Sequence, residues 1–177
     1  MTKRGAAVWV SAILYFGIGI VIITILLTAG LPVINKLKDK NVVIQSKQVM
    51  HTLDENIRDV IREGPGSQRV VTVNLKKGEL EVDDGNDLVR WTYRNSNVLI
   101  SEPGIDVREG RLNVRTEEAL QGDKYDITIT IYYSTVADIS TDTGVGNLVG
   151  LTDLIVRNEG LNNTNAEFVT VSISRTN

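Results

Sequence analysis

The stretch AAVWVSAILYFGIGIVIITILLTAGL, residues 6–31, decides how this 177-residue chain is built. It contains no charged side chain, and its only hydroxyl groups are those of Ser11, Tyr15, Thr24 and Thr28. About 20 consecutive apolar residues cross the hydrocarbon core of a bilayer as a helix, and Ser and Thr are tolerated because they can donate to carbonyls of the preceding turn. These 26 residues therefore predict a single membrane-spanning helix with some tilt.

A very short charged leader, Met1–Gly5, directly precedes this helix. A secretory signal has only 7–15 apolar residues, followed by a small-residue cleavage site. The apolar stretch of this chain is too long for such a signal. The junction Arg4-Gly5-Ala6-Ala7 resembles the cleavage site of type IV prepilins, in particular the short-leader (class III) form of archaeal pilins and archaellins. The resemblance implies that a prepilin peptidase cuts between Gly5 and Ala6 and that the hydrophobic helix is retained.

The chain departs from the pilin pattern at two positions. Bacterial members carry a glutamate five residues into the mature helix, where this chain has Val10, and many archaeal members begin with glutamine, where this chain would begin with Ala6. These departures argue against a bacterial major pilin more than against the wider superfamily.

Residues 32–63 predict a second, amphipathic half of the helix. The apolar side chains that share one face recur at steps of three, four and seven residues, and they are Val43, Met50, Leu53, Ile57 and Val60. Charged side chains occupy the other faces, and Asp54–Arg58 and Asp59–Arg62 have the spacing of helical ion pairs.

Glycine and proline mark the middle and the end of this long helix. Pro32, after Gly30, lacks an amide hydrogen and would clash with the carbonyl of Thr28, so we expect a kink or a local break there. The segment Gly64-Pro65-Gly66 predicts the end of the helix, because glycine adopts the left-handed cap and proline does not continue a helix.

Residues 67–177 predict an antiparallel β-rich exported domain, because the apolar period changes to two. We expect its buried face to pack on Val43–Val60, which gives an α+β fold: a long N-terminal helix on an antiparallel sheet. A turn at Lys76–Gly78 should make the first two strands a hairpin. The loops at 116–124 and 138–147 are the longest. The expected strands are residues 69–75, 79–82, 88–93, 98–101, 105–108, 111–115, 125–134, 148–157 and 168–175.

Composition excludes several kinds of site. The chain has no cysteine and one histidine, His51, which excludes thiolate chemistry and a multi-histidine metal site. A net charge of −3 argues against binding nucleic acid through overall charge. No nucleotide-binding, hydrolase or zinc-protease motif occurs. We assign no catalytic, cofactor-binding or metal-binding residue and expect that the protein is not an enzyme.

Four stretches have weaker chemical patterns. Oxygen ligands at Asp83–Asp87 and at Asp138–Asp142 could suit Ca²⁺, but neither has the glycine or the final glutamate of an EF-hand loop, so we interpret both as solvated turns. The charge run Glu117-Glu118 with Asp123 should face water. Asn162 begins an Asn-Asn-Thr triplet that fits a glycosylation site.

The leading functional prediction is a structural subunit of an archaeal-style type IV pilus-like filament or pseudopilus, processed after Gly5. Its expected partners are other pilin subunits, the prepilin peptidase and, before assembly, membrane lipid. We expect a single-pass membrane protein with its C-terminal domain outside the cell, then an extracellular filament. Residues 1–66 carry +3 and residues 67–177 carry −6, a balance typical of an exported distal domain.

Two alternatives stay open. A monotopic membrane-anchored binding or adhesion protein would keep an uncleaved helix, and a membrane-tethered hydrolase would need a specific carboxylate that no pattern nominates. The sequence does not separate a major from a minor subunit, or adhesion from secretion or DNA uptake.

Overall fold

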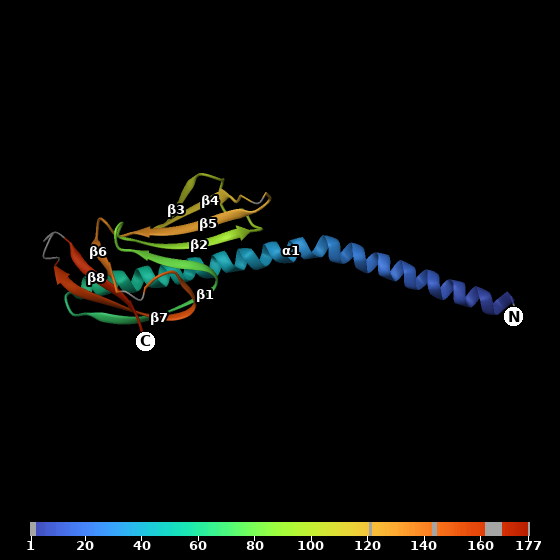
Figure 1. Ribbon diagram of the computed structural model, residues 1–177, viewed down its shortest axis with the longest axis horizontal. Coiled ribbons are helices and arrows are strands. Elements are labelled where there is room, and N and C mark those ends of the chain that lie inside the picture. Colours follow the sequence, from blue (N-terminus) through green and yellow to red (C-terminus); the bar gives the residue numbers. More distant parts are fainter. Residues whose placement is uncertain (1–2, 121, 143–144, 162–167, 177) are drawn as a thin grey trace. The chain divides into compact units, whose positions relative to one another are not determined.

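The computed structural model describes residues 3–120, 122–142, 145–161 and 168–176, with side chains from Trp9 onward. It forms two compact units, Met1–Lys38 and Asp39–Asn177, which we describe separately. One helix, α1 (Lys3–Glu63), begins in the first unit and ends in the second (Figure 1). The strands are β1 (Gln68–Asp83), β2 (Leu88–Ser96), β3 (Asp106–Glu109), β4 (Leu112–Glu118), β5 (Tyr125–Tyr132), β6 (Ala137–Thr141), β7 (Leu148–Leu161) and β8 (Val169–Arg175).

The first unit is helical throughout its described part. Thr24 Oγ1 donates to the carbonyl of Ile20 and Thr28 Oγ1 to that of Thr24, each at 2.8 Å, so these hydroxyls are satisfied inside the helix. The helix continues through Gly30 and Pro32, so the expected local break does not occur. The kink expected there stays a prediction.

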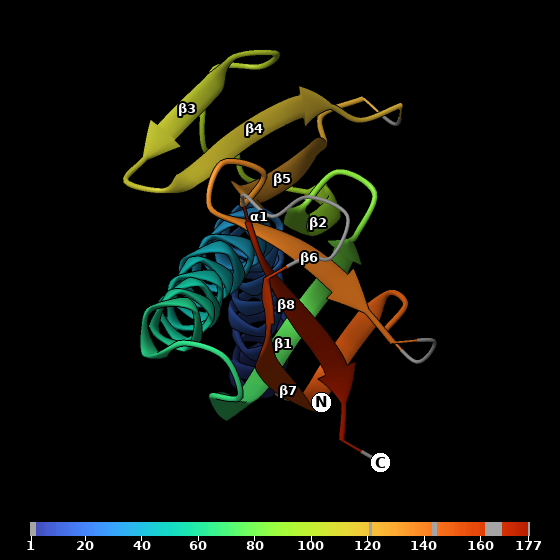
Figure 2. The same ribbon diagram turned by 90° about the vertical axis from the view of Figure 1, so that its left-hand side faces the viewer.

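The second unit is an eight-stranded sheet that curls around α1 from Asp39 onward (Figure 2). The strand order is β3-β4-β5-β2-β1-β7-β8-β6, and all pairs are antiparallel except β6–β8, which is parallel. The five apolar residues predicted to share one helix face are each at most 1% exposed and belong to the same core as the inner face of the sheet. The α+β fold class is therefore confirmed, with a mostly rather than wholly antiparallel sheet.

The end of α1 is held by the sheet. Gly64 has φ = 93°, as the predicted glycine cap requires, and the helix ends at Glu63. The buried Asn158 of β7 donates through Nδ2 to the carbonyl of Val60 at 3.0 Å, and Ser67 Oγ donates to the same carbonyl at 2.7 Å. Because the last carbonyls of a helix lack partners within it, the Asn158 bond fastens α1 to β7 and the Ser67 bond fastens it to the residue before β1.

The predicted hairpin at Lys76–Gly78 is wrong, because β1 runs through these residues as one strand. β1 pairs with β7 over Gln68–Leu75 and with β2 over Glu79–Asp83, and its register against β7 shifts between Leu75 and Leu80. Gly78 has φ = 80° at this irregularity. A glycine after two lysines therefore marks a bulge, which redirects the strand without reversing it.

The predicted strand at residues 98–101 is also wrong. The amide of Asn97 donates to Asp39 Oδ2 at 2.9 Å, and the amide of Val98 donates to Ser96 Oγ at 3.1 Å. Because side chains take these donors, the segment leaves the sheet, although Val98 still packs against the core.

One strand was missed. β6 begins one residue before the stretch 138–147 that we expected to be a loop, continues into it, and pairs with β8. The other predicted strands correspond to β2–β5, β7 and β8, with ends that differ by at most four residues.

Candidate functional site

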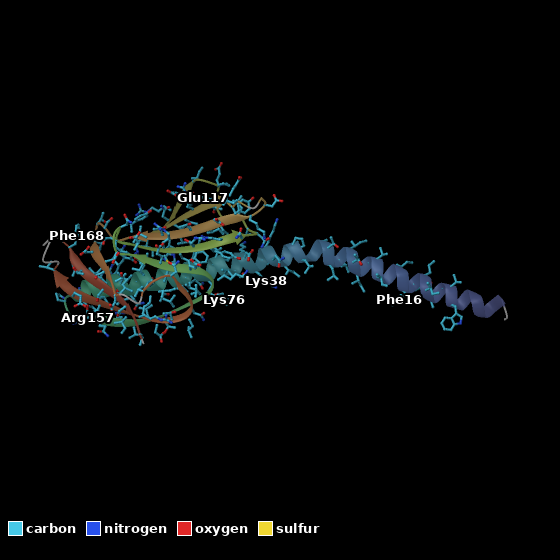
Figure 3. All side chains as sticks on the ribbon, viewed as in Figure 1. Phe16, Lys38, Lys76, Glu117, Arg157 and Phe168 are labelled. Carbon is cyan, nitrogen blue, oxygen red and sulfur yellow. The ribbon has the colours of Figure 1, made fainter. Side chains whose placement is uncertain are left out.

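The most distinctive functional feature is the apolar part of α1. It is long and apolar enough to cross a membrane, and it lies near the N-terminus, where a signal sequence would pass the same test. In the first unit its large side chains project outward from the helix, as Figure 3 shows for Phe16, which is 72% exposed. An apolar surface of this size is normally covered by lipid or by protein, because soluble proteins rarely expose such large apolar areas to water.

The predicted processing residues lie at the start of this helix. The backbone of Arg4, Gly5 and Ala6 is helical, and their side chains lie outside the described part. Cleavage after Gly5 stays a prediction. The predicted glycosylation site, Asn162, also lies outside the described residues.

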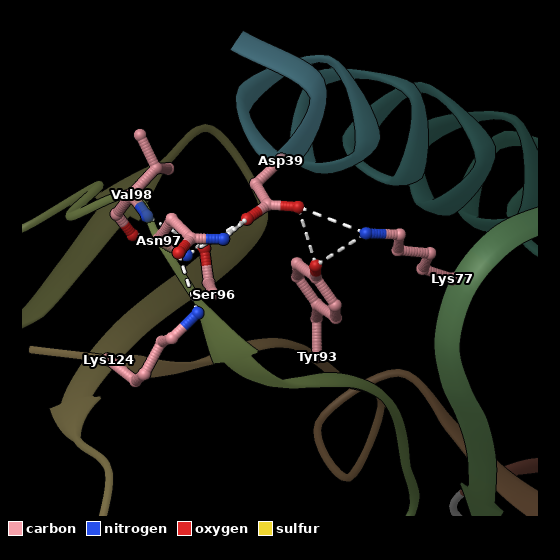
Figure 4. A network of polar contacts seen from close by, with 7 residues as sticks. All are labelled: Asp39, Lys77, Tyr93, Ser96, Asn97, Val98 and Lys124. Atoms are coloured by element: carbon pink, nitrogen blue, oxygen red, sulfur yellow. Dashed lines mark hydrogen bonds and ion pairs between the residues drawn. The ribbon is translucent and has the colours of Figure 1, made fainter. Parts of the chain in front are cut away.

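A buried polar network begins at Asp39, the first residue of the second unit (Figure 4). Its side chain is 2% exposed and accepts four hydrogen bonds. Oδ1 accepts from Tyr93 Oη at 2.7 Å and from Lys77 Nζ at 3.1 Å. Oδ2 accepts from the amide and the side chain of Asn97 at 2.9 and 2.6 Å, and Lys124 Nζ donates to Asn97 Oδ1 at 2.6 Å.

This network holds the Asp39 carboxylate in its charged form. Burial acts to raise the pKa of Asp39, but hydrogen bonds from Asn97, Tyr93 and Lys77 outweigh it and lower the pKa from 3.8 to about 2. The carboxylate thereby ties α1 to β1, β2 and the segment after β2. Its arrangement suits a structural anchor for the helix as it enters the domain.

We expect Asp39 to make the domain acid-sensitive. Because its pKa is lower in the folded state, it contributes stability above pH 4, about 2 kcal/mol, which is lost as the pH falls from about 4 to 2. In the variant Asp39→Asn this contribution should be missing at pH 7, and the unfolding free energy should depend less on pH in this window. Urea unfolding of the full chain in detergent measures both. The control Glu55→Gln removes an exposed carboxylate of the same helix and should leave the free energy of unfolding at pH 7 unchanged.

A second buried carboxylate lies further along α1. Asp54 is 0% exposed, accepts from Arg58 Nε at 2.9 Å and also accepts from Arg111 Nε. The Arg58 guanidinium lies over the ring of Tyr133, 5.8 Å from its centroid. Burial and then the charge of Asp54 raise the pKa of Tyr133 well above its ordinary value, and its hydroxyl has no well-formed hydrogen bond among the described residues.

Sequence reasoning missed both buried carboxylates. Asp39 is not singled out in the sequence analysis, and Asp54–Arg58 is interpreted there only as a helical ion pair on the polar faces. The sequence did contain a signal that these two carboxylates would be buried. Asp39 lies four residues before Val43 and Asp54 three residues before Ile57, so both lie on the same face of the helix as the buried apolar residues. The ion pairs themselves form, with Asp59–Arg62 at 3.7 Å.

The acidic turns expected to face water contact each other. Thr141 Oγ1 donates to Asp84 Oδ2 at 3.0 Å, and the amide of Ile139 donates to Asp87 Oδ1 at 2.8 Å. Within the ranges that the structure describes, no group of three or more His, Asp or Glu side chains is placed to hold a metal ion. His51 is exposed, as are Glu117, Glu118 and Asp123.

Comparison with known proteins identifies the family to which the chain belongs. No curated protein and no solved structure matches the chain. A family model, described as a family of unknown function (DUF7289), matches residues 4–102, which are 99 of the 177 residues and include α1 from Arg4 onward, β1 and β2. With its apolar helix, its Asp39 anchor and the first two strands inside the matched region, this chain belongs to DUF7289, a family of unknown function.

Proposed function

We propose that this protein is a structural subunit of an archaeal-style type IV pilus-like filament or pseudopilus. The observation that carries the proposal is the division of α1, whose first half exposes apolar side chains while its second half buries a stripe in the β domain. A subunit of this kind needs one helix with both properties: lipid surrounds the apolar half before assembly, and neighbouring helices surround it afterwards.

The proposed mechanism is physical rather than catalytic. A prepilin peptidase removes Met1–Gly5, and with it the charges of Lys3 and Arg4, which frees the helix to leave the bilayer. Apolar helices then bundle as the filament core, and the β domain lies outside the cell on the filament surface. The partners are further subunits, of this chain or of related pilins, and no enzyme activity is proposed.

The test is the intact mass and N-terminal sequence of the protein in its native membrane and filament fractions. We expect a chain that begins at Ala6 and that sediments with filaments visible by electron microscopy. A chain that keeps Thr2–Gly5 and is monomeric in detergent would overturn the proposal. It would favour the alternative of an anchored extracellular binding or adhesion protein with an uncleaved helix.

A further inference from the structure

The β domain has an arginine-lined groove at one end of the β4–β5 hairpin. The groove measures about 630 Å³, and its lining includes Arg58, Arg108, Arg111, Tyr132 and Val136. Each of the three arginines uses Nε for an internal hydrogen bond: Arg58 and Arg111 donate to Asp54, and Arg108 donates to the carbonyl of Gly110. Their terminal nitrogens donate no further hydrogen bond among the described residues, so the groove offers unused donors.

The groove is positive within an acidic domain. Three arginines in the lining face one carboxylate there, Asp106, and the buried Asp54, which Arg58 and Arg111 share. Arg115 pairs with both Asp106 and Glu117, at 3.4 and 2.8 Å, so it leaves this balance positive. The walls also have an apolar part, since Tyr132 is 53% exposed and Val136 is partly exposed. The matching ligand is therefore a surface that combines carboxylates with an apolar side chain.

The other end of the same hairpin has that combination. Leu120 is fully exposed, at 108%, and the amide of Ala119 donates to the carbonyl of Lys124 to close the tip. Glu118 and Asp123 beside it are exposed and form no ion pair within the part of the chain that the structure describes. We call the exposed side chains of Glu118, Leu120 and Asp123 the acidic tip. A protruding leucine between two carboxylates is complementary to the arginine-lined groove.

The two surfaces cannot meet within one molecule. The antiparallel register pairs Glu118 with Tyr125 at the tip and Asn113 with Thr130 towards the groove. Strand β4, which separates them, spans about 20 Å, and Figure 1 shows the β4–β5 hairpin extended rather than folded back on itself. A contact between a tip and a groove must therefore join two copies. A reciprocal pair of such contacts would close as a two-fold dimer, whereas one contact to each neighbour continues head to tail, which is the arrangement that a filament requires.

We propose that the acidic tip of one copy binds in the arginine-lined groove of the next, which gives a head-to-tail contact between β domains. This inference rests on the proposed filament function and deepens it by naming a contact outside the helical core. Leu120 packs against Tyr132 and Val136, while Glu118 and Asp123 receive hydrogen bonds from the guanidinium groups. Repetition of the contact produces an open chain of subunits.

Cysteine crosslinking in the full chain tests the contact, and the native chain offers a clean background because it has no cysteine. The double variant Leu120→Cys/Val136→Cys, mildly oxidised in its native membrane or filament fraction, should give a ladder of disulfide-linked oligomers. An internal disulfide is excluded, because the two positions lie at opposite ends of the β4–β5 hairpin and a disulfide needs Cα atoms within about 7 Å. Each single variant should stay uncrosslinked, as should the control pair Leu120→Cys/Arg175→Cys.

A charge swap in the double-cysteine chain sharpens the test. Arg108→Glu should abolish the ladder, and adding Glu118→Arg to the same chain should restore it. A dimer from Leu120→Cys alone would mean a tip-to-tip contact and would overturn the proposal. Filaments that begin at Ala6 but give no ladder would overturn this contact and leave the proposed function standing, whereas a chain without filaments or ladder would overturn both.

Discussion

Replacing Gly5 by leucine is expected to abolish both processing and assembly. The resemblance to prepilins places the cut directly after this glycine, and a residue without a side chain is used where another backbone must approach closely. In the variant the peptidase would meet a branched side chain at that point. The protein should then accumulate in the membrane with its whole leader still attached, as intact mass measures, and no filaments should be seen by electron microscopy.

The matched control is Gly17→Leu. Gly17 lies in the same helix and has open space around its Cα in the structure, so added bulk there meets no neighbouring atom. This variant should be cut after Gly5 as the wild type is. Filaments of normal appearance from Gly5→Leu would refute the cleavage hypothesis, and loss of processing in both variants would point to a general effect of bulk in the helix.

Gly78→Ala is expected to be the most destabilising of the conservative substitutions in the β domain. A Cβ at this position would lie 2.6 Å from Trp91 Nε1 and 2.7 Å from the carbonyl oxygen of Thr92. Trp91 is 0% exposed and donates to the carbonyl of Lys77 at 3.2 Å. To make room for the Cβ, the indole or the backbone would have to move, which would disrupt the packing of Trp91 and this hydrogen bond. Overpacking and the positive φ together should lower the free energy of unfolding by about 3 kcal/mol or more.

Gly150→Ala separates these two causes. Gly150 in β7 has φ = 74°, close to that of Gly78, but a Cβ there would have nothing within 4 Å. Only backbone strain remains, about 1 kcal/mol. Urea unfolding of the two full-length variants in detergent, followed by tryptophan fluorescence, measures the difference. Equal losses would mean that the close approach of Trp91 to β1 is not an important constraint.

The spacing of apolar residues was sufficient to predict those helices and strands that bury one face. The apolar helix face from Val43 to Val60 and the strand at residues 88–93 were predicted, because each pattern reports one side of one element. The helix face is buried, and so are the alternating Val89, Trp91 and Tyr93 of the strand. The glycine cap at Gly64 was predicted for a similar reason, since its cause is local.

What could not be predicted depends on distant partners. Lys76–Gly78 has the composition of a turn, and only the pairing of β1 with both β2 and β7 makes it a bulge. The short sequence of β6 has little apolar character, and it becomes a strand through pairing with β8, about 30 residues later. Asp39 and Asp54 are buried because side chains distant in the sequence reach them: Tyr93 of β2, Asn97 just after β2, and Arg111 between β3 and β4.

The parallel pairing of β6 with β8 has a consequence for the order in which the domain forms. β6 precedes β7 and β8 in the chain, yet β8 lies between β7 and β6 in the sheet. A chain emerging from a ribosome or a translocation channel must therefore keep β6 unpaired until β8 has been released. The sheet is completed from its C-terminal strand, and loss of β8 would detach two strands rather than one.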